Sequence, residues 1–108
     1  MESERMAFAN INTSDSGATV IIPGVEGRRI HIQGALLIAA GDVTATIEDT
    51  DGTDLIGPMA LAAKGGFALP PTEKGYQQTE PGKGVQIRLS GAVQVGGSIT
   101  YTEVAWRI

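Results

Sequence analysis

The sequence predicts an all-β protein, an antiparallel β-sandwich of about eight or nine short strands. Apolar and polar residues alternate along most of the chain, which is the period of a strand with one face in a core and the other in water. Turn residues punctuate these segments, and the 108-residue chain holds 15 Gly and 5 Pro. No segment of useful length has the period of an amphipathic helix.

In chain order, strands are expected at residues 6–12, 19–22, 28–40, 43–48, 55–61, 66–69, 76–79, 85–90 and 98–108. The clearest alternation lies in 43–48 and 85–90, where aliphatic residues occupy one parity. Gly57 and Pro58 interrupt the fifth segment, which is typical of an edge or bent strand. The last segment is rich in Thr, Tyr, Val and Trp, all good strand formers.

The strongest expected strand is residues 28–40. Ile30, Ile32, Leu36 and Ile38 share one parity, and Gly34 lies between them. A glycine inside a strand often marks a bulge or bend. The residues at the intervening positions, which face the other side of the strand, change from polar to aliphatic along the segment. We therefore expect this strand to begin half-exposed and to end covered on both faces.

That change of parity predicts a surplus of aliphatic side chains on second faces of the strands. The residues concerned are Ala35, Leu37, Ala39 and Ala60. A monomer of this size would cover them poorly, whereas contacts between subunits would cover them.

Turn pairs are expected between the strands. Asp51-Gly52 is the best candidate for a two-residue hairpin turn, because both residues tolerate a positive φ. Gly96-Gly97 also reads as a turn between apolar runs. Residues 60–64 would form at most one turn of helix before the glycine pair at 65–66.

Length and composition predict a single domain over residues 6–108, preceded by a flexible N-terminus at residues 1–5. The formal net charge of −4 argues against nucleic acid and anionic membrane surfaces as partners. There is no Cys, so no disulfide or thiolate metal site is expected. The first residues lack an apolar signal segment, and no stretch approaches the length of a membrane helix.

No catalytic residue, cofactor or metal site is predicted. His31 is the only histidine; catalysis would need partners converging on it, and a surface or interface role fits its polar parity better. The acidic residues of 48–54 offer oxygen ligands, but their spacing does not match a calcium loop, so a solvated hairpin tip is favoured over a metal site. The sequence thus predicts a protein that is not an enzyme.

Five residues are candidates for an interface. Arg28 and Arg29 either mark a charged strand entry or anchor a partner, since Arg is enriched at interfaces. His31 follows on the same segment. Tyr101 and Trp106 lie on opposite parities of the last segment, so one of them is expected in the core and the other on the surface.

A pattern of strands and turns runs from Thr19 to Val104. Its segments are residues 20–24 (VIIPG), 27–32 (GRRIHI), 43–49 (VTATIED), 55–61 (LIGPMAL), 65–70 (GGFALP), 75–76 (GY), 84–90 (GVQIRLS) and 95–104 (VGGSITYTEV). This pattern resembles the small β-sandwich proteins of tailed-bacteriophage structural modules, which include capsid decoration or cement proteins and head-fibre proteins. The resemblance rests on strands and turns and includes no active-site motif.

The resemblance implies a jelly-roll-like sandwich that serves as a structural component of the virion. Such proteins decorate or cement capsids, usually as homotrimers that contact the major capsid protein or other virion proteins. The expected location is the virion, assembled in the host cytoplasm. The alternative is a phage fibre or a receptor- or carbohydrate-binding β-sandwich module; the scarcity of aromatic residues makes sugar binding the weaker hypothesis.

Overall fold

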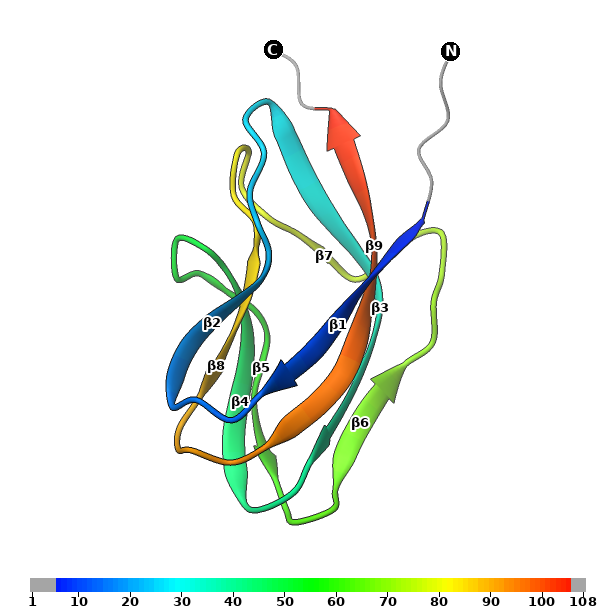
Figure 1. The fold of residues 1–108 in the computed structure, drawn as a ribbon. Coiled ribbons are helices and arrows are strands. Elements are labelled where there is room, and N and C mark those ends of the chain that lie inside the picture. Colours follow the sequence, from blue (N-terminus) through cyan, green and yellow to red (C-terminus); the bar gives the residue numbers. More distant parts are fainter. Residues whose placement is uncertain (1–5, 106–108) are drawn as a thin grey trace.

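The computed structural model describes residues 6–105, which form nine strands and no helix. Figure 1 shows two sheets packed face to face. The strands are β1 (Ala7–Thr13), β2 (Gly17–Ile22), β3 (Arg28–Ala39), β4 (Val43–Asp49), β5 (Asp54–Leu61), β6 (Gly66–Leu69), β7 (Gln77–Gln78), β8 (Val85–Leu89) and β9 (Val95–Ala105). The prediction for residues 1–5 and the candidate Trp106 lie outside the described residues.

The strand order confirms a β-sandwich with jelly-roll pairing. The five-stranded sheet has the order β1-β9-β3-β6, with β7 also paired to β3, and the four-stranded sheet has the order β2-β8-β4-β5. All of these pairs are antiparallel. Setting β7 aside, the first strand pairs with the last, the second with the last but one, and so inward, as in one long hairpin rolled into two sheets.

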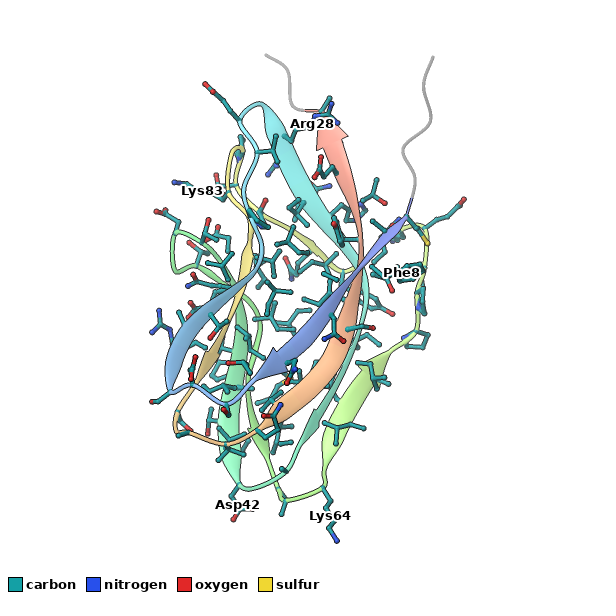
Figure 2. All side chains as sticks on the ribbon, viewed as in Figure 1. Phe8, Arg28, Asp42, Lys64 and Lys83 are labelled. Atoms are coloured by element: carbon teal, nitrogen blue, oxygen red, sulfur yellow. The ribbon has the colours of Figure 1, made fainter. Side chains whose placement is uncertain are left out.

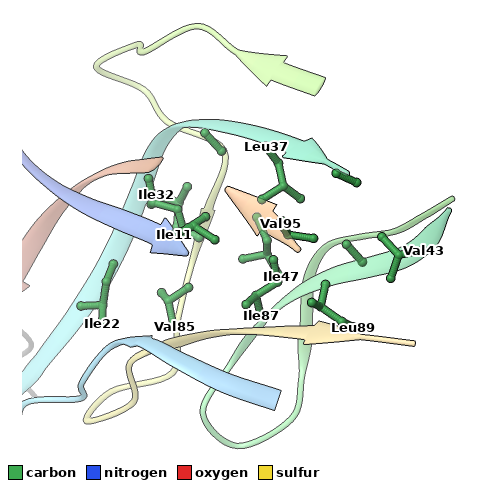
Figure 3. Packing of buried hydrophobic residues seen from close by; sticks show 14 of the residues in the cluster. Ile11, Ile22, Ile32, Leu37, Val43, Ile47, Val85, Ile87, Leu89 and Val95 are labelled. Atoms are coloured by element: carbon green, nitrogen blue, oxygen red, sulfur yellow. The ribbon is translucent and has the colours of Figure 1, made fainter. Parts of the chain in front are cut away.

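The core between the sheets is entirely aliphatic among its fully buried members (Figure 3). They are Ile11, Ile22, Ile30, Ile32, Ala35, Leu37, Ala39, Val43, Ala45, Ile47, Val85, Ile87, Leu89, Val95 and Ile99. Both sheets contribute to this layer through alternate residues of their strands. Burial of each larger side chain stabilises the fold by about 1.5–3 kcal/mol relative to exposure.

A bulge in β3 decides which of its residues reach that core. The pairing of β3 with β9 shifts register between Ile32 and Gly34, so one residue of β3 has no counterpart. Because side chains alternate, an extra residue moves the following apolar set to the opposite face. Leu37 is therefore buried, whereas Leu36 lies on the outer face.

This corrects two expectations from the sequence. The isoleucines before the bulge are buried, but Leu36 and Ile38, which share their parity, are 44% and 52% exposed. Ala35, Leu37 and Ala39 belong to the core rather than to a second face. The bulge predicted at Gly34 is present, and it exchanges the two faces of the strand.

Most strand positions agree with the sequence within two residues, and the exceptions lie in turns. Gly96 and Gly97 lie inside β9 rather than in a turn. The hairpin between β4 and β5 has a four-residue connection at 50–53 instead of a two-residue turn at Asp51-Gly52. Gly52 does have the positive φ that was expected, at 93°.

The connection between β6 and β8 is tied to β3. It carries β7, which pairs with His31 and Ile32, and it returns to the four-stranded sheet at Val85. Tyr76 and Thr79 donate backbone hydrogen bonds to the carbonyl oxygens of Ile32 and Ile30. This segment therefore completes the edge of β3 where β6 ends.

Within residues 6–105 the structure contains no helix with the length and apolar character needed to cross a bilayer.

Candidate interaction surface

The outer face of the five-stranded sheet carries the most exposed apolar side chains. Phe8 on β1 is 74% exposed, more than any other large hydrophobic residue among those described. Register places it beside Thr100, while Leu36 and Ile38 lie beside Ser98 and Gly96. All of these positions alternate with core residues of the same strands, so they share one outward face.

A shallow apolar hollow lies on this face at the end away from Phe8. Its volume is about 440 Å³, and its lining includes Leu36, Ile38, Gly96, Lys64 and Gln94. Gly96 has no side chain to fill the space between these residues. Figure 2 shows Phe8 about halfway up the molecule and Lys64 at its lower end.

The basic pair and His31 lie at the other end of β3. Arg28 is exposed, whereas Arg29 is partly buried and donates from Nε to the carbonyl oxygen of Thr79 at 2.9 Å. His31 donates from Nε2 to the carbonyl oxygen of Lys74 at 2.8 Å. Arg29 and His31 therefore hold the connection between β6 and β8, whereas the side chain of Arg28 is exposed.

Tyr101 fills the core side of β9. It pairs with Ile32 in the register and packs against the buried cluster. Of the two alternatives for this aromatic pair, Tyr101 is thus the one directed inward. Its partner in that prediction, Trp106, falls beyond the described residues.

The outer face of the four-stranded sheet differs in chemistry. Glu48, only 4% exposed, accepts a hydrogen bond from Gln86 Nε2 at 2.6 Å and one from Arg88 Nε at 2.9 Å. Burial acts to raise the pKa of Glu48, but the hydrogen bonds from Arg88 and Gln86 and the charge of Arg88 outweigh it. The pKa therefore lies below its ordinary value of 4.5, and the carboxylate is held ionised.

The acidic turn after β4 is organised by one aspartate. Asp49 is fully buried, and its Oδ1 accepts hydrogen bonds from the backbone N–H groups of Asp51 and Thr53 at 2.9 and 3.1 Å. Its Oδ2 is buried without a hydrogen-bond partner. No group of three or more His, Asp or Glu side chains in residues 6–105 is placed to hold a metal ion.

The sequence missed the apolar surface on the five-stranded sheet. From the sequence, Phe8 belongs to an early strand and has no predicted role, and Leu36 and Ile38 share the parity of the core residues Ile30 and Ile32. The available signal was Gly34: one extra residue there moves Leu36 and Ile38 outward. Phe8 gave its own signal, since the residues on the same face of β1 are Asn10 and Asn12.

Comparisons with models of protein families, with curated proteins and with solved structures find no match to this chain.

Proposed function

We propose that this chain is a non-enzymatic structural subunit that associates with copies of itself and decorates the head of a tailed phage. The observation that carries this proposal is the exposed apolar set of Phe8, Leu36 and Ile38 on one outer face of the sandwich. Solitary apolar residues are ordinary on a surface, but a group on one flat sheet face is typical of an interaction site.

The contrast between the two outer faces supports the same reading. The four-stranded sheet presents the ionic group of Glu48 and Arg88, which suits contact with water or with a polar partner. The five-stranded sheet presents Phe8, Leu36 and Ile38 among small and uncharged polar residues, which suit a contact with few charges. A subunit that binds its own copies by one face keeps the other free for a larger assembly.

Jelly-roll pairing is compatible with a role in the virion, because this architecture recurs in viral capsid proteins. It also recurs in lectin domains, so the fold alone does not distinguish the two. A homotrimer that contacts the major capsid protein is the form that the sequence resemblance implies.

Binding to heads tests the decoration role. Purified protein is mixed with undecorated heads of the phage whose genome encodes the chain and is then sedimented. The proposal predicts that the protein pellets with heads, saturates at a fixed ratio to the capsid protein, and stays in the supernatant without heads. Protein that stays in the supernatant at all ratios would overturn the decoration role.

A carbohydrate-binding module is the second candidate, since Phe8 and Tyr76 present exposed rings. The hydroxyl of Tyr76, however, donates to the carbonyl oxygen of Pro70 at 2.6 Å, and Phe8 offers no polar group of its own. Sugar binding usually combines a ring with converging polar groups. Selective hits on a glycan array that Phe8→Ala and Tyr76→Ala abolish would replace the decoration proposal with this one.

A further inference from the structure

We infer that Phe8 of one copy inserts into the apolar hollow of a neighbouring copy. This inference rests on the self-association proposed above and names the contact that drives it. Its occupant is a second copy of this chain, because the chain carries both halves of the contact on one face. A protruding apolar group that matches a hollow elsewhere on the same molecule joins copies into a closed assembly where the rotation between copies closes, and into a filament where it does not.

Phe8 is the protruding half of this contact. It is 74% exposed and is not part of the core cluster or of the residues packed against it. Its cross-strand neighbour is Thr100, and the next outward residue on β1 is Asn10. None of these side chains is large enough or apolar enough to cover a phenyl ring, so the ring is available to a partner.

The hollow is the receiving half. Leu36 and Ile38 form its apolar floor, and both are about half exposed. Gly96 opens the space beside Ile38, its register partner. Lys64 and Gln94 lie at its boundary and supply the polar rim that surrounds the apolar centre of many interfaces.

Phe8 cannot fill the hollow of its own chain. Its register partner Thr100 is four residues from Gly96 along β9, a distance of about 13 Å in a strand. A phenylalanine side chain does not reach that far along the sheet. In a closed assembly such as the expected trimer, each copy would insert one phenyl group into a neighbour and receive one in its own hollow.

The competing mode of association is pairing between free strand edges. β1 is an edge strand of seven residues without a charge, a proline or a register shift, whereas the β5 edge carries Pro58 and two register shifts. Open edges of this kind pair with other chains. This mode would place Phe8 near β1 of the neighbour rather than near the hollow, so a contact map separates the two.

Photocrosslinking from position 8 provides that map. Phe8 is replaced by benzoylphenylalanine, which keeps an aromatic ring, and the labelled chains are mixed with isotopically heavy chains so that links between copies are distinguished by mass. We expect links to residues 36–40 or 94–97 of the heavy chain. Links concentrated on residues 7–13 or on the four-stranded sheet would overturn the inference, as would an assembled sample without links between copies.

Two variants test the contact from its two sides. Phe8→Ala removes the ring, and Gly96→Leu fills the hollow; a Cβ at Gly96 meets only the carbonyl oxygen of Ile11, at 3.8 Å, so the fold accommodates it. Each is expected to raise the dissociation constant of the assembly about thirtyfold or more, as for an interface hot spot. Val20→Ala is the matched control, since Val20 is 54% exposed on the other sheet.

The outcomes separate this contact from the wider proposal. An assembly that survives both variants unchanged overturns the role of Phe8 but leaves self-association standing. A chain that is monomeric without any substitution overturns both. Head binding by the native protein is measured in parallel, so a failure of the Phe8 contact is not mistaken for a failure of decoration.

Discussion

At Gln33 and Gly34, strand β3 carries one residue more than the opposing part of β9. The side chain of Gln33 is buried there, where it accepts a hydrogen bond from Thr102 Oγ1 at 2.5 Å and donates to the carbonyl oxygen of Glu73 at 3.2 Å. A Cβ on Gly34 would lie 3.1 Å from the carbonyl oxygen of Leu69, closer than usual for such contacts. The buried side chain of Gln33 thus has hydrogen-bond partners at the bulge. Position 34 has little room for a side chain, which suits glycine.

The bulge predicts unequal losses of stability when each of two adjacent leucines is replaced by alanine. Leu37→Ala is expected to lower the free energy of unfolding by about 2–5 kcal/mol, because it leaves a cavity in the core. Leu36→Ala is expected to lower it by less than about 1 kcal/mol, because that side chain is already half in water. Urea unfolding of dilute, monomeric protein gives both values. Equal costs, or a larger cost at Leu36, would contradict the described faces of β3.

The lowered pKa of Glu48 predicts that the stability of the fold depends on pH. Its pKa in the folded protein lies below the ordinary 4.5, so the folded state favours the ionised form. This stabilisation is fully present above about pH 4.5 and is lost as the pH falls through the lowered pKa. Unfolding curves of the native chain and of Glu48→Gln should therefore converge as the solution is acidified. A difference in stability that stays constant from pH 7 to the acid limit would contradict the role of this carboxylate.

Among the elements, the connection from β6 to β8 depends most on side-chain hydrogen bonds. His31 holds the carbonyl oxygen of Lys74, and Thr79 exchanges hydrogen bonds with Ile30. The two-residue strand β7 would be marginal without these contacts, because it has a partner on one side only. This connection is expected to open more readily than the rest of the sandwich.

His31→Ala tests that expectation. Loss of the hydrogen bond to Lys74 is expected to cost about 0.5–1.5 kcal/mol locally, which favours opening of residues 70–76. Limited digestion with trypsin should then cut after Lys74 several times faster than in the native protein. Cleavage after Lys64, which follows β5, serves as the internal control and should keep its rate. Equal acceleration at both sites would indicate general destabilisation instead.

The positions of the strands were predictable from the sequence because they depend on the local order of apolar, polar and turn-forming residues. Alternation located β4 and β8, and the glycine and proline pairs located most turns. The outer face was less predictable, because the exposure of Leu36 and Ile38 depends on how β3 pairs with a strand about sixty residues later in the chain. Arg29 and His31 were recognised as unusual, but their bonds to Thr79 and Lys74 depend on where the 70–84 connection returns to β3.

The whole molecule is a sandwich whose two outer faces differ in chemistry. The apolar face carries Phe8, Leu36 and Ile38, and the polar face carries the Glu48–Arg88 ion pair. Covering the apolar face removes exposed hydrocarbon from water, with a gain of roughly 25 cal/mol per Å². Association is therefore expected to use this face and to leave the half-exposed side chain of Arg88 accessible.

Molar mass measured by light scattering shows whether the chain associates through its apolar face. The native chain is expected to give a multiple of the chain mass, three in the case of the trimer. Ile38→Lys, which places a charge on the apolar face, is expected to give the mass of one chain, while the matched Val20→Lys on the other sheet keeps the native mass. A native protein that is monomeric at every concentration, or an Ile38→Lys variant that assembles as the native chain does, would contradict the account.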